Sequence, residues 1–433
     1  MSSKAIAARL AATQILHGVL FDKRLMAEML SGSKSPIARL SPADRARAQS
    51  MATGVLRHLE GIDAILNVYL ERPPQPRAMQ ALRLATYEML AEQTAAHGAV
   101  NAAVEIVRGS AKAGHLAGLV NAVARKVADE GPALWQDQKP QKLPSWLARP
   151  ITKNFGKEVL TPIEAAHQAG AAIDLTLKDQ GRSDEFVERL NATLLPTGSL
   201  RLPGRPQVSA LPGFVEGDWW VQDAAAALPA RMLGDVDGKN VLDLCAAPGG
   251  KTMQMASSGA WVSAVDISDA RLDRLRENLE RVGLRAHLID EDATRFEPDE
   301  PFDAVLLDAP CSATGTIRRH PDLPFAKAGV DMSGLFDLQA RLIDAALSQL
   351  KPDGYLVYCT CSLLPREGER QVADALARHE NLRVAPVDWV TLGVDPTWQT
   401  ADGGLRLRPD YWPDLGGMDG FYMALLQNGE KAR

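Results

Sequence analysis

The chain has 433 residues and a formal net charge of −6, with 46% hydrophobic and 24% charged residues. This composition is typical of a folded globular protein and excludes a fibrous or wholly disordered chain. The length exceeds what one compact core usually holds, so we expect two or three domains. Only four cysteines are present, which argues against a disulfide scaffold and favours a reducing compartment such as the cytoplasm. No run of eighteen apolar residues occurs, so no membrane span is expected. The apolar stretch Ala5–Leu20 leaves an organelle transit peptide as the alternative.

Residues 1–130 are predicted to form a helical domain, because apolar residues recur there at intervals of three and four. One such stripe runs through Met51, Val55 and Leu59. Ser41-Pro42 is typical of a helix start, and at ~10–14 residues per helix the segment holds some five to seven helices. The segment carries 16 Lys and Arg against 11 Asp and Glu, which fits contact with a polyanion such as RNA and equally a solvated helical face.

Residues 131–232 are predicted to comprise a linker, which begins at Gly131-Pro132, and a small subdomain after it. The apolar runs in this part are short, and turn signals stand at Pro196-Thr197-Gly198, Pro203-Gly204 and Pro212-Gly213. We expect a small α+β subdomain here.

Residues 233–433 alternate short β-rich runs with helical ones, which predicts a doubly wound α/β sheet. A β-hairpin is expected to close the domain, from Leu405–Arg408 and Gly420–Gln427. The other expected elements are strands at Val241–Cys245, Trp261–Ile267, Ala286–Asp290, Phe302–Asp308 and Tyr355–Cys359, and helices at Asp269–Val282 and Leu335–Leu350.

A glycine-rich turn between the first of these strands and a helix, Cys245–Lys251, is the strongest sign of a ligand site. Ligands of open α/β sheets bind at the carboxyl ends of strands, where glycine lets the backbone approach them closely. The spacing is neither that of a dinucleotide-binding turn nor that of a P-loop.

Three aspartates at strand ends extend this site. Asp266 is placed to accept from ribose hydroxyls, although an acidic residue is also favourable ahead of a helix. Asp292 could accept from an adenine amine or belong to a solvated acidic loop. Asp308 ends an apolar strand, and a carboxylate there needs a partner such as a cationic ligand or a base edge.

The four cysteines fall into two kinds. Cys245 and Cys359 fit small buried apolar residues, whereas Cys311 and Cys361 stand just past predicted strand ends. No metal site is expected, because Cys-x-Cys with two distant cysteines lacks the usual zinc-binding spacing.

Three motifs together resemble the RsmB/Fmu (Sun) branch of the RNA cytosine-5 methyltransferases. They are Asp243-Leu-Cys-Ala-Ala-Pro-Gly-Gly-Lys-Thr252, Leu307-Asp-Ala-Pro-Cys-Ser-Ala-Thr-Gly315 with its continuation to Asp322, and Cys359-Thr-Cys-Ser362. Gln222-Asp223 and Asp419-Gly-Phe-Tyr422 also match, whereas the stretch 171–178 departs from the expected pattern.

The resemblance implies a mostly parallel, seven-stranded Rossmann-like sheet behind an all-α NusB-like RNA-binding domain at 1–130, with a further RNA-binding part at 131–232 and the catalytic domain at 233–433. It implies that Cys361 is the nucleophile and that Cys311 assists release. A nucleophilic thiol needs a lowered pKa, and Lys251 is a candidate for the cation that lowers the pKa of Cys361. The substrate it implies is RNA, most directly 16S rRNA, bound by a monomer that acts on neither DNA nor membranes. The S-adenosylmethionine site would comprise Cys245, Ala246, Ala247, Pro248, Gly249, Gly250, Lys251, Asp266, Asp292 and Asp308.

Other functions stay open at this point. A DNA cytosine-5 methyltransferase would use a Pro-Cys nucleophile like Pro310-Cys311, although the helical domain and Cys361 argue against it. A ribosome-assembly factor with a residual methyltransferase fold, or methylation of another RNA, is the second alternative. A nicotinamide dehydrogenase is disfavoured by the glycine spacing.

Overall fold

The computed structural model describes residues 3–429, which fall into two compact units. The first unit contains the chain up to Ala169 together with Ile317–Val330, and the second contains Gly170–Thr316 and the chain from Asp331 onward. No helix among residues 3–429 is long and apolar enough to cross a membrane.

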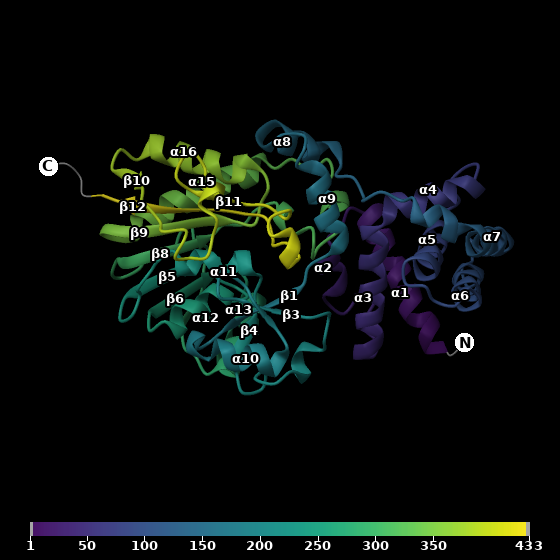
Figure 1. The fold of residues 1–433 in the computed structure, drawn as a ribbon, viewed down its shortest axis with the longest axis horizontal. Helices are drawn as coiled ribbons and strands as arrows, with labels where there is room; N and C mark the ends of the chain where they lie inside the picture. The colour runs from purple at the N-terminus through teal and green to yellow at the C-terminus, as the bar shows by residue number, and fades with distance from the viewer. Residues whose placement is uncertain (1–2, 430–433) are drawn as a thin grey trace. The chain divides into compact units, whose positions relative to one another are not determined.

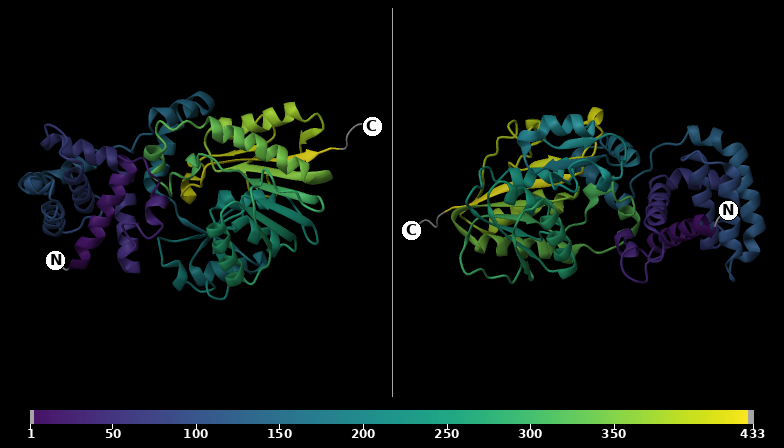
Figure 2. Two further views of the ribbon diagram at one scale, coloured as in Figure 1. Left: turned by 180° about the vertical axis from the view of Figure 1, so that it is seen from behind. Right: turned by 90° about the horizontal axis from the view of Figure 1, so that it is seen from below.

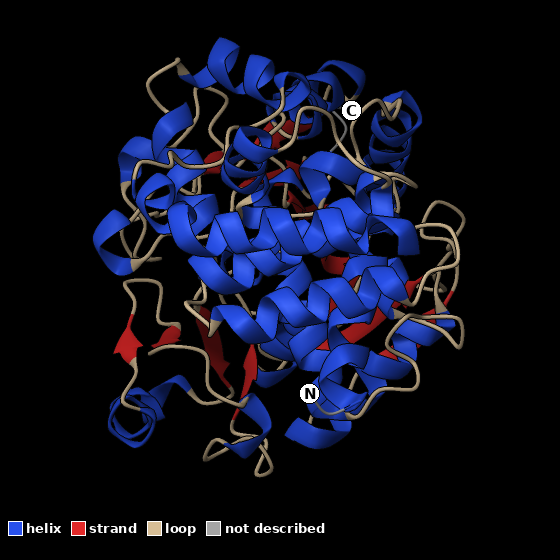
Figure 3. Ribbon diagram, turned by 90° about the vertical axis from the view of Figure 1, so that its right-hand side faces the viewer, coloured by secondary structure: helices blue, strands red, loops and turns tan. Residues whose placement is uncertain are grey.

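The first unit is built from helices, which Figure 3 shows in blue. Seven of them precede residue 137 in the described part of the chain, as the apolar spacing predicts. The helices of this unit are α1 (Ser3–Leu20), α2 (Met26–Leu30), α3 (Pro42–Arg57), α4 (Leu59–Tyr69), α5 (Pro76–Leu90), α6 (Ala96–Arg108), α7 (Ala117–Gln136), α8 (Ser145–Phe155), α9 (Leu160–Ala169) and α14 (Leu323–Ala326).

Helix starts in this unit follow local chemistry. The Ser41 hydroxyl accepts a hydrogen bond from the backbone N–H of Asp44 at 3.2 Å, so Ser41 caps α3 as predicted. Helix α5 begins at a proline, Pro76. Proline is favourable at this position because the N–H groups of the first helical turn have no acceptor within the helix.

The predicted linker at Gly131-Pro132 is wrong, because α7 continues through both residues to Gln136. Gly131 is buried, and Leu134 and Trp135 pack against the core of the helical bundle. Burial of these two side chains outweighs the loss of one helical hydrogen bond at Pro132.

The small α+β subdomain predicted in the middle of the chain is present in the second unit. Its strands run antiparallel in the order β2-β3-β1-β4, and Phe186 and Trp219 lie at the centre of its core. The elements are β1 (Ile173–Leu177), α10 (Ser183–Leu190), β2 (Thr193–Leu194), β3 (Leu200–Leu202) and β4 (Trp219–Val221).

The large sheet of the second unit has the order β10-β12-β9-β8-β5-β6-β7, and β11 pairs with β12 as an eighth strand. The five strands from β9 to β7 run parallel, whereas β10, β11 and β12 pair antiparallel. The mostly parallel Rossmann-like fold and the closing hairpin are thus confirmed, but the sheet has eight strands and not the seven that were expected, because β11 adds to β12. The strands are β5 (Asn240–Leu244), β6 (Trp261–Asp266), β7 (His287–Asp290), β8 (Phe302–Asp308), β9 (Leu350–Thr360), β10 (Leu382–Val384), β11 (Leu405–Leu407) and β12 (Phe421–Asn428).

Helices cover both faces of this sheet, as Figures 1 and 2 show. Alternate residues of β5 face opposite ways: Val241 packs in a core with α11 and α12, and Leu242 packs in a core with α15. The helices are α11 (Ala224–Arg231), α12 (Gly250–Ser257), α13 (Asp269–Val282), α15 (Ser333–Ser348) and α16 (Glu369–Arg378).

Candidate functional site

The candidate site lies at the carboxyl ends of neighbouring parallel strands. Strands β5, β8 and β9 are adjacent in the sheet, and they end at Leu244, Asp308 and Thr360. The glycine-rich turn and both Cys311 and Cys361 follow these ends, so the sheet order brings together motifs that lie far apart in sequence. This edge is where open α/β sheets bind their ligands.

The glycine-rich turn after β5 has an unusual backbone. Cys245 has a φ of +60° and Gly249 a φ of +100°. A Cβ at Gly249 would lie 1.9 Å from Leu275 Cδ1, so both the backbone and the space require glycine. The Ala246 N–H donates to the Val265 carbonyl at 3.1 Å, and this bond ties the turn to β6. Burial raises the pKa of Cys245 to about 12, so this thiol keeps its proton at neutral pH.

Asp266 holds the turn from the end of β6. Its carboxylate is 1% exposed and accepts from the backbone N–H groups of Ala247 and Ser268, both at 3.1 Å. The Arg271 guanidinium lies 3.3 Å from the same carboxylate. Asp266 therefore already organises the glycine-rich turn, and its two oxygens retain lone pairs for a further donor.

Asp308 has a protein partner, which the sequence did not identify. Its carboxylate pairs with Lys251 Nζ at 2.6 Å. Burial lowers the pKa of Lys251, but the charge and the hydrogen bond of Asp308, together with the charges of neighbouring groups, raise it above its usual value. The charge of Lys251 is thus taken up by Asp308, and the expectation that Lys251 serves Cys361 gains no support.

Asp292 follows β7 in a short turn. Its carboxylate accepts from the backbone N–H and the hydroxyl of Thr294, at 2.9 and 2.8 Å, and these bonds lower the pKa of Asp292. The side chain is 37% exposed, so it remains open to a ligand.

Asp243 and Ile267 belong to this region, although sequence reasoning did not single them out. Asp243 is 1% exposed; its Oδ2 accepts from the Thr252 hydroxyl at 2.6 Å, and its Oδ1 has no hydrogen-bond partner. Burial raises the pKa of Asp243 to about 7. The sequence does contain a sign of Asp243, because a carboxylate stands there inside the apolar strand β5. Ile267 is 70% exposed directly after Asp266 and presents an apolar surface at the same edge.

Cys311 and Cys361 come together although 50 residues separate them. Their Sγ atoms lie 3.4 Å apart, in loops that follow the adjacent strands β8 and β9. The contact with Cys361, together with burial, raises the pKa of the Cys311 thiol well above its usual value. Cys311 therefore holds its proton and can donate it toward the Cys361 sulfur. Cys359, by contrast, is fully buried in β9.

The site offers a buried acceptor to a cationic ligand. Among residues 3–429, no group of three or more His, Cys, Asp and Glu side chains is arranged to hold a metal ion. The unpartnered Oδ1 of Asp243 is a buried acceptor, and a cationic donor would satisfy it.

Comparisons with known proteins agree with this geometry. The family described as "16S rRNA methyltransferase RsmB/F" matches residues 230–427, and the NusB family matches residues 6–129. Ribosomal RNA small subunit methyltransferase B of Xanthomonas campestris is 35% identical over 440 residues, which covers 97% of each chain. The protein of that name from Vibrio vulnificus is 34% identical over 440 residues, covering 96% of this chain and 98% of its own length.

A solved structure supports the fold over the whole chain. The crystal structure of PH0851 matches with a TM-score of 0.74 and 21% identity, covering 98% of this chain and 99% of that one. The chain therefore belongs to the RsmB/F family of ribosomal RNA methyltransferases, and its methyl donor is S-adenosylmethionine.

Proposed function

We propose that this enzyme methylates C5 of a cytosine in 16S rRNA through a covalent bond between Cys361 and C6 of the base. The observation that carries the proposal is the pair of sulfurs, 3.4 Å apart beside the glycine-rich turn. A methyltransferase acting on an oxygen or an exocyclic nitrogen needs no such pair. C5 of cytosine, by contrast, is a poor nucleophile until a thiolate has added to C6.

The two cysteines divide the chemistry. The Cys361 thiolate adds to C6, and the electron pair of the C5–C6 double bond makes C5 nucleophilic. When bound, S-adenosylmethionine supplies an electrophilic methyl group. C5 would take up this methyl group as the bond between the methyl carbon and the sulfonium sulfur breaks. C5 then loses its proton to solvent, the C5–H electron pair restores the double bond, and the C6–Sγ pair returns to Cys361. Cys311 holds a proton beside the departing sulfur and can share it, which favours release.

The remaining side chains bind the cofactor in this proposal. Asp243 and Asp308 would face its positive charge, Asp266 its ribose and Asp292 its adenine amine. Ile267 would stack on the adenine ring. Residues 245–251 would shape the pocket through their backbone. The Cys245 thiol is neutral because of its raised pKa, so it would add no charge to the pocket.

We further propose that residues 1–130 and 131–232 bind the RNA, that the protein acts as a cytoplasmic monomer, and that DNA is not a substrate. The match of residues 6–129 to the NusB family and the basic surplus of residues 1–130 support the first part. The target base must leave its stack to expose C6 to a thiol.

The test is methyl transfer from tritiated S-adenosylmethionine to 16S rRNA and to DNA of matched sequence. After nuclease digestion, the label should co-migrate with 5-methylcytidine and be absent from DNA. Label in N4-methylcytidine or in a methylated ribose would refute the proposal. An enzyme that methylates another RNA but not 16S rRNA would refute the substrate assignment alone.

A further inference from the structure

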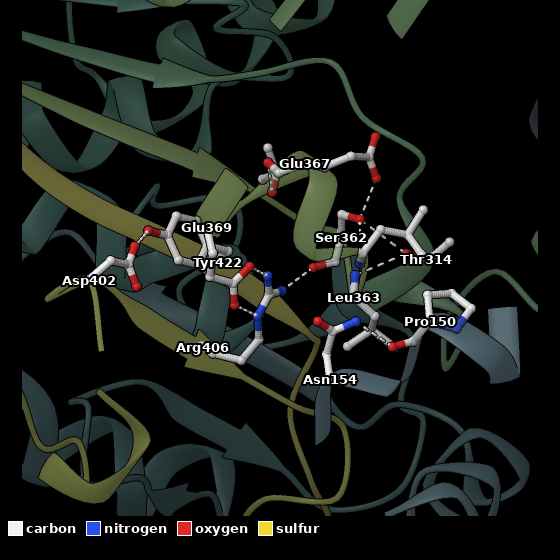
Figure 4. Close-up of polar contacts among 12 residues, drawn as sticks. Pro150, Asn154, Thr314, Ser362, Leu363, Glu367, Glu369, Asp402, Arg406 and Tyr422 are labelled. Atoms are coloured by element: carbon white, nitrogen blue, oxygen red, sulfur yellow. Dashed lines mark hydrogen bonds and ion pairs between the residues drawn. The ribbon is translucent and has the colours of Figure 1, made fainter. Parts of the chain in front are cut away.

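A single buried carboxylate connects the two loops that carry the thiols. Ser312 directly follows Cys311 and Ser362 directly follows Cys361, and both serines are fully buried. Both bind Glu367, which is likewise fully buried. Glu367 Oε1 accepts from the backbone N–H of Ser312 at 2.8 Å, and Oε2 accepts from the hydroxyls of Ser312 and Ser362. The bond to Ser362 is drawn in Figure 4.

The surrounding groups complete this network. The two serine hydroxyls lie 3.1 Å apart, and the Thr314 hydroxyl lies 3.1 Å from one and 3.2 Å from the other. Gln339 Nε2 donates to Glu367 at 3.1 Å and to the Pro310 carbonyl at 2.9 Å. The carboxylate thus has four donors, which hold the Glu367 side chain in one position.

Glu367 is itself fixed to the strand that leads into Cys361. Its carbonyl oxygen accepts from the Tyr358 hydroxyl at 2.7 Å and from the Thr360 hydroxyl at 3.1 Å. The backbone of Glu367 is therefore fixed to β9, and its side chain binds the loop after β8.

A cation fixes the Cys361 loop from another direction. Arg406, in β11, donates to the Ser362 carbonyl and pairs with Glu369 at 2.6 Å (Figure 4). In addition, the Gly315 N–H donates to the Cys361 carbonyl at 3.0 Å. The carbonyl groups of Cys361 and Ser362 are therefore both held in place, and the Glu367 side chain binds both cysteine loops.

We propose that Glu367 is a positioning residue that sets the separation of the Cys311 and Cys361 thiols. This inference rests on the proposed roles of the two cysteines. Addition and release take place at one base, so both sulfurs must reach that base without a rearrangement of either loop. Catalysis is steeply sensitive to such placement, because a displacement of about 1 Å costs on the order of 100-fold in rate.

The experiment uses the full chain with Glu367→Gln, Glu367→Ala and the control Asp303→Asn. Gln keeps the size of Glu and one acceptor, so it retains part of the network. Asp303 stands on the same strand as Asp308 but at its opposite end, where it accepts from Asn240 N–H and Lys351. The control therefore removes a carboxylate from β8 without touching the cysteine loops.

Two readouts separate positioning from a general loss of stability. The first is the rate at which diamide, a two-electron oxidant that takes up two hydrogens, joins Cys311 to Cys361 in the protein without RNA or cofactor. Peptide mapping follows the linked pair. The second is kcat and KM for methyl transfer to 16S rRNA.

We expect Glu367→Ala to slow disulfide formation and to lower kcat, each on the order of 100-fold, and Glu367→Gln to do so by about tenfold. KM for RNA and cofactor should stay at the wild-type value in both, and Asp303→Asn should match wild type in every readout. If Glu367→Ala does not fold, Glu367→Gln decides the question. A folded Glu367→Gln protein that forms the disulfide at the wild-type rate overturns the inference, as does a raised KM with an unchanged kcat.

Failure of the proposed function gives a different result. If the wild-type protein forms no 5-methylcytidine while Glu367→Gln still slows disulfide formation, the positioning role is supported and the proposed cytosine chemistry is refuted. If the wild type forms 5-methylcytidine and Glu367→Gln changes neither the rate of disulfide formation nor kcat, the proposed chemistry is supported and the positioning role is refuted.

Discussion

Asp243 is expected to make cofactor binding depend on pH near neutrality. Burial raises its pKa to about 7, and its Oδ1 has no hydrogen-bond partner. A cationic ligand binds the ionised carboxylate and not the neutral acid. The fraction ionised rises from about one tenth at pH 6 to about nine tenths at pH 8, so affinity should rise about tenfold over that interval, or ~1.4 kcal/mol.

The sign of the effect follows from the direction of the pKa shift. A carboxyl group with a raised pKa is neutral below that pKa, so cofactor affinity is low at pH 6 and increases as pH rises through 7. In the free protein the opposite holds for stability. Ionisation of a buried carboxylate without a full set of donors costs free energy, so stability should fall as pH rises from about 4 toward the folded-state pKa.

The assay is calorimetric titration with S-adenosylmethionine at pH 6, 7 and 8, using wild type and Asp243→Asn. The variant should bind weakly and lack the part of the pH dependence that wild type owes to Asp243; titration of the ligand itself cancels in the comparison. The free variant should also unfold at a higher temperature than wild type at pH 8. Equal pH slopes in the two proteins would refute the reasoning.

Three further changes test other parts of the site. Asp266→Asn should weaken cofactor binding by about 1.5–3 kcal/mol, the range of one hydrogen bond to a charged group, and an unchanged dissociation constant would exclude the ribose role. Gly315→Ala should lower both the melting temperature and kcat, because its Cβ would lie 1.8 Å from the Gly420 carbonyl oxygen; a wild-type melting curve would contradict this. Replacing the exposed residues Lys23 and Arg24 with Gln should leave kcat unchanged. It should reduce the slope of the logarithm of the RNA-binding constant against the logarithm of salt concentration by about 0.9 for each phosphate that the protein no longer neutralises. An unaltered slope would show that neither residue contacts RNA phosphates.

The sequence predicted the five parallel strands and the closing hairpin of the catalytic domain, but not β10 or α16. Phe302–Asp308 and Asp269–Val282 have the predicted bounds, because an apolar run and a strong helical period end at clear turn or capping residues. The three motifs also predicted the family, since each spans the end of a strand and the loop that follows it.

Other features depend on contacts between distant parts of the chain. Helix α7 passes through Pro132 because Leu134 and Trp135 find a core to pack against. The segment Ile317–Val330 belongs to the helical unit, where the Met26 N–H donates to Asp322 at 2.9 Å. A deletion of residues 1–130 would therefore remove the partners of this segment, which is why point substitutions are the better test of RNA binding.

The chemistry of the site was predictable only in part. Cys361 and Cys311 stand in recognisable motifs, but their 3.4 Å approach follows from the adjacency of β8 and β9. The pairing of Lys251 with Asp308 at 2.6 Å was not predictable, because sequence does not show which side chains meet at the edge of the sheet. Glu367 lies in no motif that suggests a role, and only convergence of two loops on its side chain distinguishes it.

The central claim is that Cys361 forms the bond to RNA and Cys311 assists its release. A denaturing gel of each alanine variant, incubated with labelled 16S rRNA and S-adenosylmethionine, tests this directly. Cys311→Ala should accumulate a protein–RNA band that survives denaturation, because addition proceeds and elimination is impaired. Cys361→Ala should give neither a band nor methylated RNA, because the first bond cannot form. A trapped band with Cys361→Ala and none with Cys311→Ala would reverse the roles and contradict the account.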